Sequence, residues 1–131
     1  MGPVMTVLLD THALLWWWES PQQLSAAARR TIESRSNAIL ISAAVAWEVA
    51  IKTKTGRVNF ESYLATWPDL VAADGFSELP ILSEHGIRAG LLPLHHKDPF
   101  DRILAAQAQV YASPIVSVDV IFDTYGVRRI W

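Results

Sequence analysis

Short apolar runs alternate with helical patterns along the chain. Residues 6–9, 38–41 and 115–118 are β-type runs without a polar face, as expected of strands buried on both sides of a sheet. Residues 76–82 and 127–130 are weaker strand candidates, the second at a sheet edge. The pattern therefore predicts a sheet of short strands.

Helices are predicted between these strands. Ser25 and Ser42 are suited to cap helices at their amino ends, and Gly56 is suited to a left-handed turn after the second of these helices. Pro68 predicts a kink or a break in a further helix. The expected helical ranges are 11–18, 25–34, 43–54, 60–73, 83–91 and 98–111. This alternation predicts an α/β fold of three layers, a mostly parallel sheet with helices on both faces.

Composition narrows the class of protein. The 131 residues are 51% hydrophobic and 18% charged, which predicts a single domain over residues 1–131 and excludes a disordered chain. No uncharged stretch reaches the ~20 residues of a membrane span. Cysteine is absent, which excludes thiolate metal ligands and is consistent with a reducing cytoplasm. The formal charge of −2 means that any site for a polyanion must be local.

Four acidic residues are candidates for one site. Asp10 and Asp119 follow predicted strands, and ligands of parallel α/β sheets bind at the carboxyl ends of the strands. Asp101 lies in the first turn of a helix that we expect to begin at the same edge, and Glu48 lies on an Ala- and Val-rich helix. Two such charges 4 Å apart repel by ~1 kcal/mol in water and ~4 kcal/mol at an effective dielectric constant of 20. Oxygen ligands favour Mg²⁺ or Mn²⁺, which would offset this repulsion and suit phosphodiester hydrolysis.

Each acidic residue also has a structural interpretation. Asp10 could cap the next helix, Glu48 could pair with Lys52 on the helix surface, and Asp119 could open a turn toward Asp123. We assign Asp98 to helix capping. The convergence of several acids on one sheet edge is what favours a site. The histidines are interpreted as structural and stay outside the catalytic set: His12, His95 and His96.

Four segments resemble the PIN-domain ribonucleases, and in particular the VapC-type toxins of toxin–antitoxin pairs. They are LLDTHALLW (8–16), ISAAVAWEVAIK (41–52), LHHKDPFDRILAAQA (94–108), and the ending from SVD (117–119) to YGV (125–127). The resemblance implies that Asp10, Glu48 and Asp101 form an Mg²⁺ or Mn²⁺ site, with Asp119 as a more variable fourth acid. It also implies a metal-dependent endoribonuclease that a cognate VapB-type antitoxin neutralises.

The expected substrate is single-stranded or looped RNA, because cleavage requires a phosphate that is accessible to the metal. Four cations near the acids could hold the RNA backbone or could simply be solvated: Lys52, Lys54, Arg57 and Arg102. Consecutive Trp16, Trp17 and Trp18 cannot all face one core, which predicts that at least one faces solvent. Such a ring could anchor the antitoxin or a homodimer, or the rings could pack against neighbouring helices.

Two other functions are compatible with parts of this pattern. A PIN-like module that binds RNA or regulates a partner without cutting would keep the same groove and partner surface. A receiver-like phosphoacceptor domain also places an aspartate after a strand. The sequence disfavours the receiver, because Leu9 and Thr11 flank Asp10 where a neighbouring acid is expected.

Overall fold

The protein forms one sheet in the order β3-β2-β1-β4-β5, and every neighbouring pair is parallel. The computed structural model describes residues 5–95 and 97–131. The predicted His96 loop position therefore lies outside the described residues. The strands are β1 (Thr6–Leu9), β2 (Ala38–Ser42), β3 (Ser77–Leu79), β4 (Ile115–Val116) and β5 (Arg129–Ile130).

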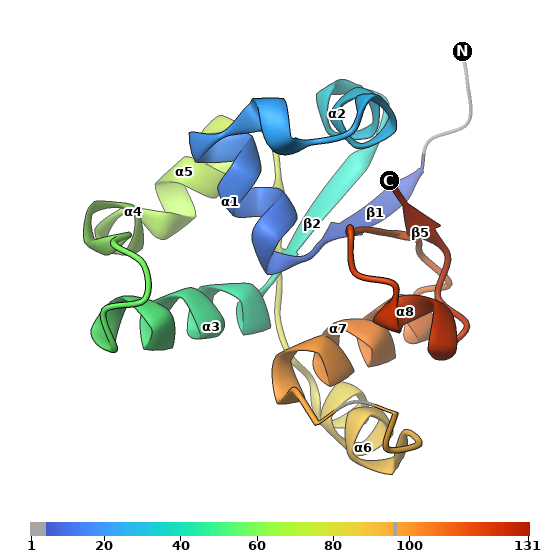
Figure 1. The fold of residues 1–131 in the computed structure, drawn as a ribbon. Coiled ribbons are helices and arrows are strands. Elements are labelled where there is room, and N and C mark those ends of the chain that lie inside the picture. Colours follow the sequence, from blue (N-terminus) through green and yellow to red (C-terminus); the bar gives the residue numbers. More distant parts are fainter. Residues whose placement is uncertain (1–4, 96) are drawn as a thin grey trace.

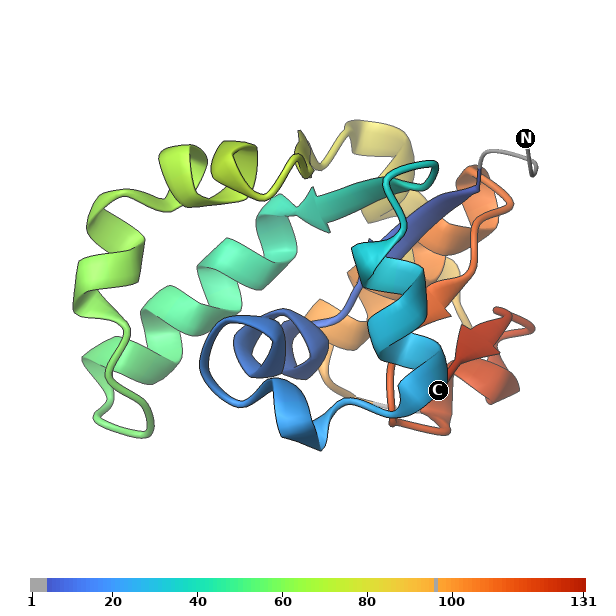
Figure 2. The same ribbon diagram turned by 90° about the horizontal axis from the view of Figure 1, so that it is seen from above.

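Helices cover both faces of this sheet, so the predicted three-layer α/β fold is confirmed. Figure 2 shows α1 and α2 on one face, with α6 and α7 on the other. Right-handed crossovers require this change of face, because the chain steps outward from β1 to β3 and then returns to β4 beside β1. The helices are α1 (Thr11–Glu19), α2 (Ala26–Glu33), α3 (Ala43–Lys54), α4 (Glu61–Ala65), α5 (Trp67–Ala73), α6 (Ser83–Leu91), α7 (Pro99–Val110) and α8 (Ile121–Thr124).

Most helix ends lie where the capping residues predict them. The Ser25 and Ser42 hydroxyls accept hydrogen bonds from the backbone N–H groups of Ala28 and Ala44, which begins α2 and α3. Gly56 follows α3 with φ of 79°, a conformation that costs glycine little. The helix predicted over 60–73 is split at Thr66, and Pro68 lies in the first turn of α5, where its missing N–H is tolerated.

The three consecutive tryptophans all pack against the core as half-buried residues, so the prediction that one faces solvent is wrong. Their rings meet different neighbours: Trp16 lies 5.7 Å from Trp131, Trp17 lies 6.2 Å from Phe76, and Trp18 lies 5.1 Å from Trp67. The reason is that α1 has packing partners on several sides (Figure 2). The indole N–H groups of Trp17 and Trp18 both donate to Asp74.

The carboxyl ends of β1 and β4 form the topological switch point of the sheet. The chain leaves β1 toward β2 on one side, and it returns to β4 on the other side. In Figure 1 the helices α1 and α3 begin below the lower ends of β1 and β2. Ligands of open α/β sheets bind at such a point, which is where the acidic residues were predicted.

Candidate active site

Asp10 lies at the end of β1 and is buried, with 6% of its surface exposed. Its backbone N–H donates to the carbonyl of Val116, which extends the pairing of β1 with β4. Its Oδ1 accepts the backbone N–H of Ala13 at 2.8 Å, so the predicted cap of α1 is present. Capping and a place in the site are therefore compatible in one carboxylate.

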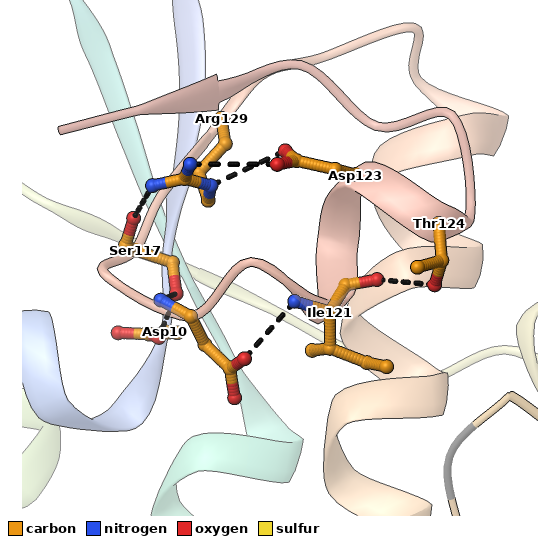
Figure 3. Close-up of polar contacts among 7 residues, drawn as sticks. Asp10, Ser117, Ile121, Asp123, Thr124 and Arg129 are labelled. Carbon is orange, nitrogen blue, oxygen red and sulfur yellow. Dashed lines mark hydrogen bonds and ion pairs between the residues drawn. The ribbon is translucent and has the colours of Figure 1, made fainter.

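Ser117 connects Asp10 to the end of β4. Its hydroxyl donates to Asp10 Oδ2 at 2.5 Å and accepts the backbone N–H of Asp119 at 2.9 Å (Figure 3). The exposed Asp119 in turn accepts the backbone N–H of Ile121 through Oδ1. The two acids predicted at neighbouring strand ends are thus joined through one buried serine.

An arginine on β5 stabilises the loop that carries Asp119. Arg129 pairs with Asp123 at 3.2 Å between Nε and Oδ1, and it donates from Nη1 to the carbonyl of Ser117 at 3.3 Å (Figure 3). Asp123 is exposed and belongs to this ion pair. The loop position therefore depends on the last strand of the sheet.

Glu48 is buried on α3 and reaches the segment next to Asp10. Its Oε1 accepts the hydroxyl of Thr11 at 2.5 Å, and its Oε2 lies 2.7 Å from the ammonium of Lys52. The predicted pair with Lys52 is therefore present, but it does not put Glu48 on the surface. Because Thr11 directly follows Asp10, the hydrogen bond places Glu48 at the same sheet edge.

Asp101 lies in the first turn of α7, half-buried. The helix begins at Asp98, whose Oδ1 accepts the backbone N–H groups of Phe100 and Asp101, so the capping role of Asp98 is confirmed. The ring of Phe100 lies 4.9 Å from that of Trp47 on α3. This contact brings the start of α7 beside the part of α3 that carries Glu48.

The electrostatics at Asp10 favour a cation from solution. Burial raises the pKa of Asp10 above its ordinary value of 3.8. Hydrogen bonds from Ser117 and Ala13 and the charge of His12 lower it, and the charge of Asp119 raises it. Within residues 5–95 and 97–131, no Lys or Arg side chain forms an ion pair with Asp10. An ionised Asp10 is thus a buried charge without a Lys or Arg partner. The charge of His12 offsets the effect of burial only in part, and a divalent ion would compensate the carboxylate further.

The donor chemistry also fits such an ion. The oxygens of these carboxylates are the ligands that Mg²⁺ and Mn²⁺ prefer, and each oxygen that accepts one hydrogen bond keeps further acceptor capacity. Across the described residues, no three Asp, Glu or His side chains are already arranged around one point. Mg²⁺ usually binds through one or two carboxylates and keeps several waters, so it does not require a closed cage.

The four predicted RNA-binding cations lie in different environments. Lys54 and Arg57 are exposed at the far end of α3 and beyond it, whereas Lys52 is paired with Glu48. Arg102 is buried, and its Nη2 donates to the carbonyls of Ala89, Gly90 and Leu92 at 2.6–3.3 Å. These bonds fix the end of α6, so the placement of Arg102 favours a structural role.

The histidines have mainly structural contacts. His12 is exposed, and its ring stacks on Trp16 at 5.5 Å. His95 lies in the segment between α6 and α7, 5.6 Å from the ring of Tyr125. The charge of His12 lowers the pKa of Asp10, so His12 acts on the site without being among its proposed ligands. Both histidines keep their structural interpretation.

Two polar residues of the site were not among the predicted ones. Ser117 orients Asp10, and Thr11 orients Glu48. Ser117 directly follows the last residue of β4, and Thr11 directly follows Asp10. The run Ser117-Val118-Asp119 carries a signal, because residues two apart at a strand end share a side of the sheet. Thr11 is a first-turn helix residue, and its partner lies 37 residues away.

These features define an α/β protein whose acidic site lies at the switch point of a parallel sheet. The family model of the PIN domain matches residues 7–127, and the chain belongs to the PIN domain family. It is similar to Ribonuclease VapC22 of Mycobacterium tuberculosis (strain ATCC 25618 / H37Rv), with 32% identity over 116 residues, 87% of each chain.

Solved structures share the fold. VapBC2 from Rickettsia felis, bound to a DNA fragment from its promoter, matches with a TM-score of 0.69 and 12% identity over 97% of this chain and 100% of that chain. A toxin–antitoxin complex from Klebsiella pneumoniae matches with a TM-score of 0.60 and 19% identity over 88% of each chain. Identities this low establish the fold and leave function to the site. In the described part of the chain, no helix is both long and apolar enough to cross a membrane.

Proposed function

We propose that the protein is a metal-dependent endoribonuclease and the toxin of a toxin–antitoxin pair. The observation that carries the proposal is Asp10, a buried carboxylate at the switch point that Ser117 connects to the second strand end and that no Lys or Arg of the described residues pairs with. The similarity to Ribonuclease VapC22 supports RNA as the substrate. The reaction is hydrolysis of a phosphodiester bond in single-stranded or looped RNA.

Asp10, Glu48 and Asp101 would hold Mg²⁺ or Mn²⁺, with Asp119 contributing directly or through water. When bound, the ion supplies Lewis acidity, which polarises the phosphoryl oxygen and lowers the pKa of the attacking water. Ser117 and the Ala13 N–H fix the direction of the Asp10 carboxylate, and Thr11 and Lys52 do the same for Glu48. Preorganised side chains of this kind lower the reorganisation that reaction requires.

The RNA backbone would run along the exposed cations of α3. Lys54 and Arg57 are free of the ion pair that occupies Lys52, and they are the better candidates for phosphate contacts. Charge reversal at both positions is expected to weaken RNA binding and to flatten its salt dependence.

The proposed partner is a VapB-type antitoxin, by analogy with the toxin–antitoxin complexes that share the fold. A homodimer also remains our prediction, and sedimentation of the purified chain over a range of concentrations measures it. Sedimentation at the mass of one chain throughout that range would contradict the homodimer.

The decisive experiment is cleavage of a mixed cellular RNA pool by the purified protein free of antitoxin, with Mg²⁺, Mn²⁺ or EDTA. We expect metal-dependent cuts that Asp10→Asn and Asp101→Asn each reduce by a factor of about 100 or more, since each removes a charged ligand. Asp98→Asn is the matched control: asparagine also caps helices, so this variant is expected to keep its activity.

Two results would contradict the proposal. Cleavage that continues in EDTA would exclude metal dependence, and full activity of folded Asp10→Asn would exclude this site. A folded parent that binds RNA and the metal but makes no cut would instead favour the non-cutting PIN-like module.

A further inference from the structure

One tryptophan of the chain faces solvent beside the acidic site. Trp47 has 53% of its surface exposed, whereas Trp16, Trp17 and Trp18 are half-buried and Trp67 is buried. It directly precedes Glu48 on α3, and successive helical residues point about 100° apart. Glu48 therefore points inward to Thr11 while the indole of Trp47 projects into solvent. The exposed ring is therefore an apolar surface with one polar N–H, open to a ligand.

Phe100 supports this ring from the second helix of the site. The two rings meet edge to face, with centroids 4.9 Å apart and planes at 79°. Phe100 is half-buried and directly precedes Asp101, as Trp47 precedes Glu48. The aromatic pair thus spans α3 and α7 next to two of the proposed metal ligands, and the contact restricts the motion of the exposed indole.

The charge around the pair favours a nucleic acid. Lys54 lies seven residues after Trp47, which puts it on the same side of α3 and about 10 Å further along the helix. An acidic peptide would be repelled by Glu48 and Asp101, and a basic peptide by Lys54 and Arg57. A nucleotide strand suits the acids, the cations and the aromatic ring together. Its phosphates would lie at the metal that the acids hold and at Lys54 and Arg57, and a base would lie on the ring of Trp47.

We propose that Trp47, supported by Phe100, is a stacking platform for an unpaired nucleobase next to the phosphodiester bond that is cut. The proposal rests on the proposed ribonuclease function and specifies its substrate. A base must be unstacked from its neighbours to lie on the indole, so the platform selects single-stranded segments. Stacking tolerates every base, so the platform constrains the position of the cut more than the sequence around it.

Binding experiments test the platform without requiring cleavage. All variants are made in the Asp10→Asn protein, so that RNA stays intact, and fluorescence anisotropy measures binding of two labelled probes. One probe is a twelve-nucleotide oligoadenylate, and the other is an abasic oligomer with the same sugar–phosphate backbone. We expect Trp47→Leu to weaken binding of the oligoadenylate about tenfold and to leave binding of the abasic probe unchanged. Trp47→Phe is expected to retain most of the affinity because it keeps an aromatic face.

Ile51→Ala is the matched control. Ile51 is also exposed on α3, one turn after Trp47, but it offers no aromatic face. It is expected to leave the affinity for both probes unchanged. Thermal unfolding of each variant checks that the fold is retained.

Equal affinity of the parent and Trp47→Leu for the oligoadenylate would overturn the proposal and would assign the exposed ring to a protein partner. Equal weakening for both probes would also overturn it, because the base would then make no contribution. The two proposals can fail separately. If Asp10→Asn binds bases through Trp47 but the unsubstituted protein does not cut RNA, base stacking on Trp47 is retained and the ribonuclease is rejected. If the unsubstituted protein cuts RNA but Trp47→Leu does not change binding, the ribonuclease is retained and the platform is rejected.

Discussion

Asp10 is held from two sides, and its two oxygens have different structural roles. Oδ1 accepts the Ala13 N–H that begins α1, and Oδ2 accepts the Ser117 hydroxyl at the end of β4. Both bonds favour the ionised carboxylate, but burial has the larger effect and raises its pKa. An ionised Asp10 therefore lowers the stability of the metal-free protein at neutral pH, and a bound cation would offset this loss.

Asp10→Asn is expected to stabilise the protein in EDTA at neutral pH. Because the pKa of Asp10 is raised in the folded state, the folded protein keeps this proton where the unfolded chain has released it. The contribution of protonated Asp10 to the stability of the parent is therefore present at low pH, and it is lost as pH rises above 3.8 through the pKa of the folded state. Thermal unfolding from pH 4 to pH 7 should show an advantage of the variant that grows with pH.

Asp98→Asn controls for the exchange of a capping aspartate, since Asp98 caps α7 in the same way. A stability difference between Asp10→Asn and the parent that does not change with pH would contradict the buried-charge explanation. Adding Mg²⁺ or Mn²⁺ should raise the unfolding temperature of the parent more than that of Asp10→Asn.

At the scale of elements, Arg102 joins α7 to the end of α6. Its Nη2 donates to the carbonyls of Ala89, Gly90 and Leu92 at the end of α6, where backbone carbonyls lack the full set of intrahelical hydrogen bonds. The guanidinium thus caps the carboxyl end of α6 and holds the start of the segment that leads to Asp98. The position of the first turn of α7, and of Asp101 within it, depends on this junction.

Arg102→Met is expected to lower the free energy of unfolding by about 2–3 kcal/mol, because it removes charge-assisted hydrogen bonds to buried carbonyls. Urea denaturation measures this loss. Arg57→Met is the comparison: Arg57 is exposed, so the variant should keep its stability and lose RNA affinity. Unchanged stability of Arg102→Met, together with weaker RNA binding, would return Arg102 to the RNA-binding residues.

Across the whole molecule, β1 is the centre of both the sheet and the core. Leu8 is fully buried and lies between Leu40 on β2 and Ile115 on β4. The strands are short, so a single side chain supplies a large part of the contact between the two helical layers. The site depends on this strand, because Asp10 follows it directly.

Leu8→Ala is expected to destabilise the protein by about 2–5 kcal/mol, the range for a large buried side chain that leaves a cavity. Leu91→Ala is the control, since Leu91 is 80% exposed on α6 and its loss should change stability by about 0.5 kcal/mol or less. Urea unfolding at a constant denaturant slope compares the two. A similar small effect of both variants would show that the core relaxes around the missing side chain.

Capping residues in the sequence predicted where several helices begin. Ser25, Ser42 and Asp98 mark helix starts because a capping side chain bonds within three residues of itself. The short helix α8 and the 3₁₀ helix at Pro21–Gln23 were not predicted, since neither has an apolar period long enough to detect. The order of the strands also requires tertiary information.

For the site too, local sequence signals indicated some residues and tertiary packing determined the others. Strand ends and a first-turn position indicated Asp10, Asp119 and Asp101 from sequence, whereas the hydroxyl that orients Asp10 Oδ2 comes from a distant part of the chain. Ser117 is separated from Asp10 by 107 residues, and no local pattern connects them. The exposure of Trp47 and the burial of Arg102 likewise depend on how α3, α6 and α7 pack together.

The link between Asp10 and Ser117 also has a consequence for the timing of synthesis. A ribosome releases Asp10 early, but the strand that orients this carboxylate emerges 107 residues later. A nascent chain can thus form α1 and α3 while the acidic edge lacks Ser117 and Asp119. A protein that cuts RNA would in this way stay harmless to the message being translated until residues 117–119 have emerged.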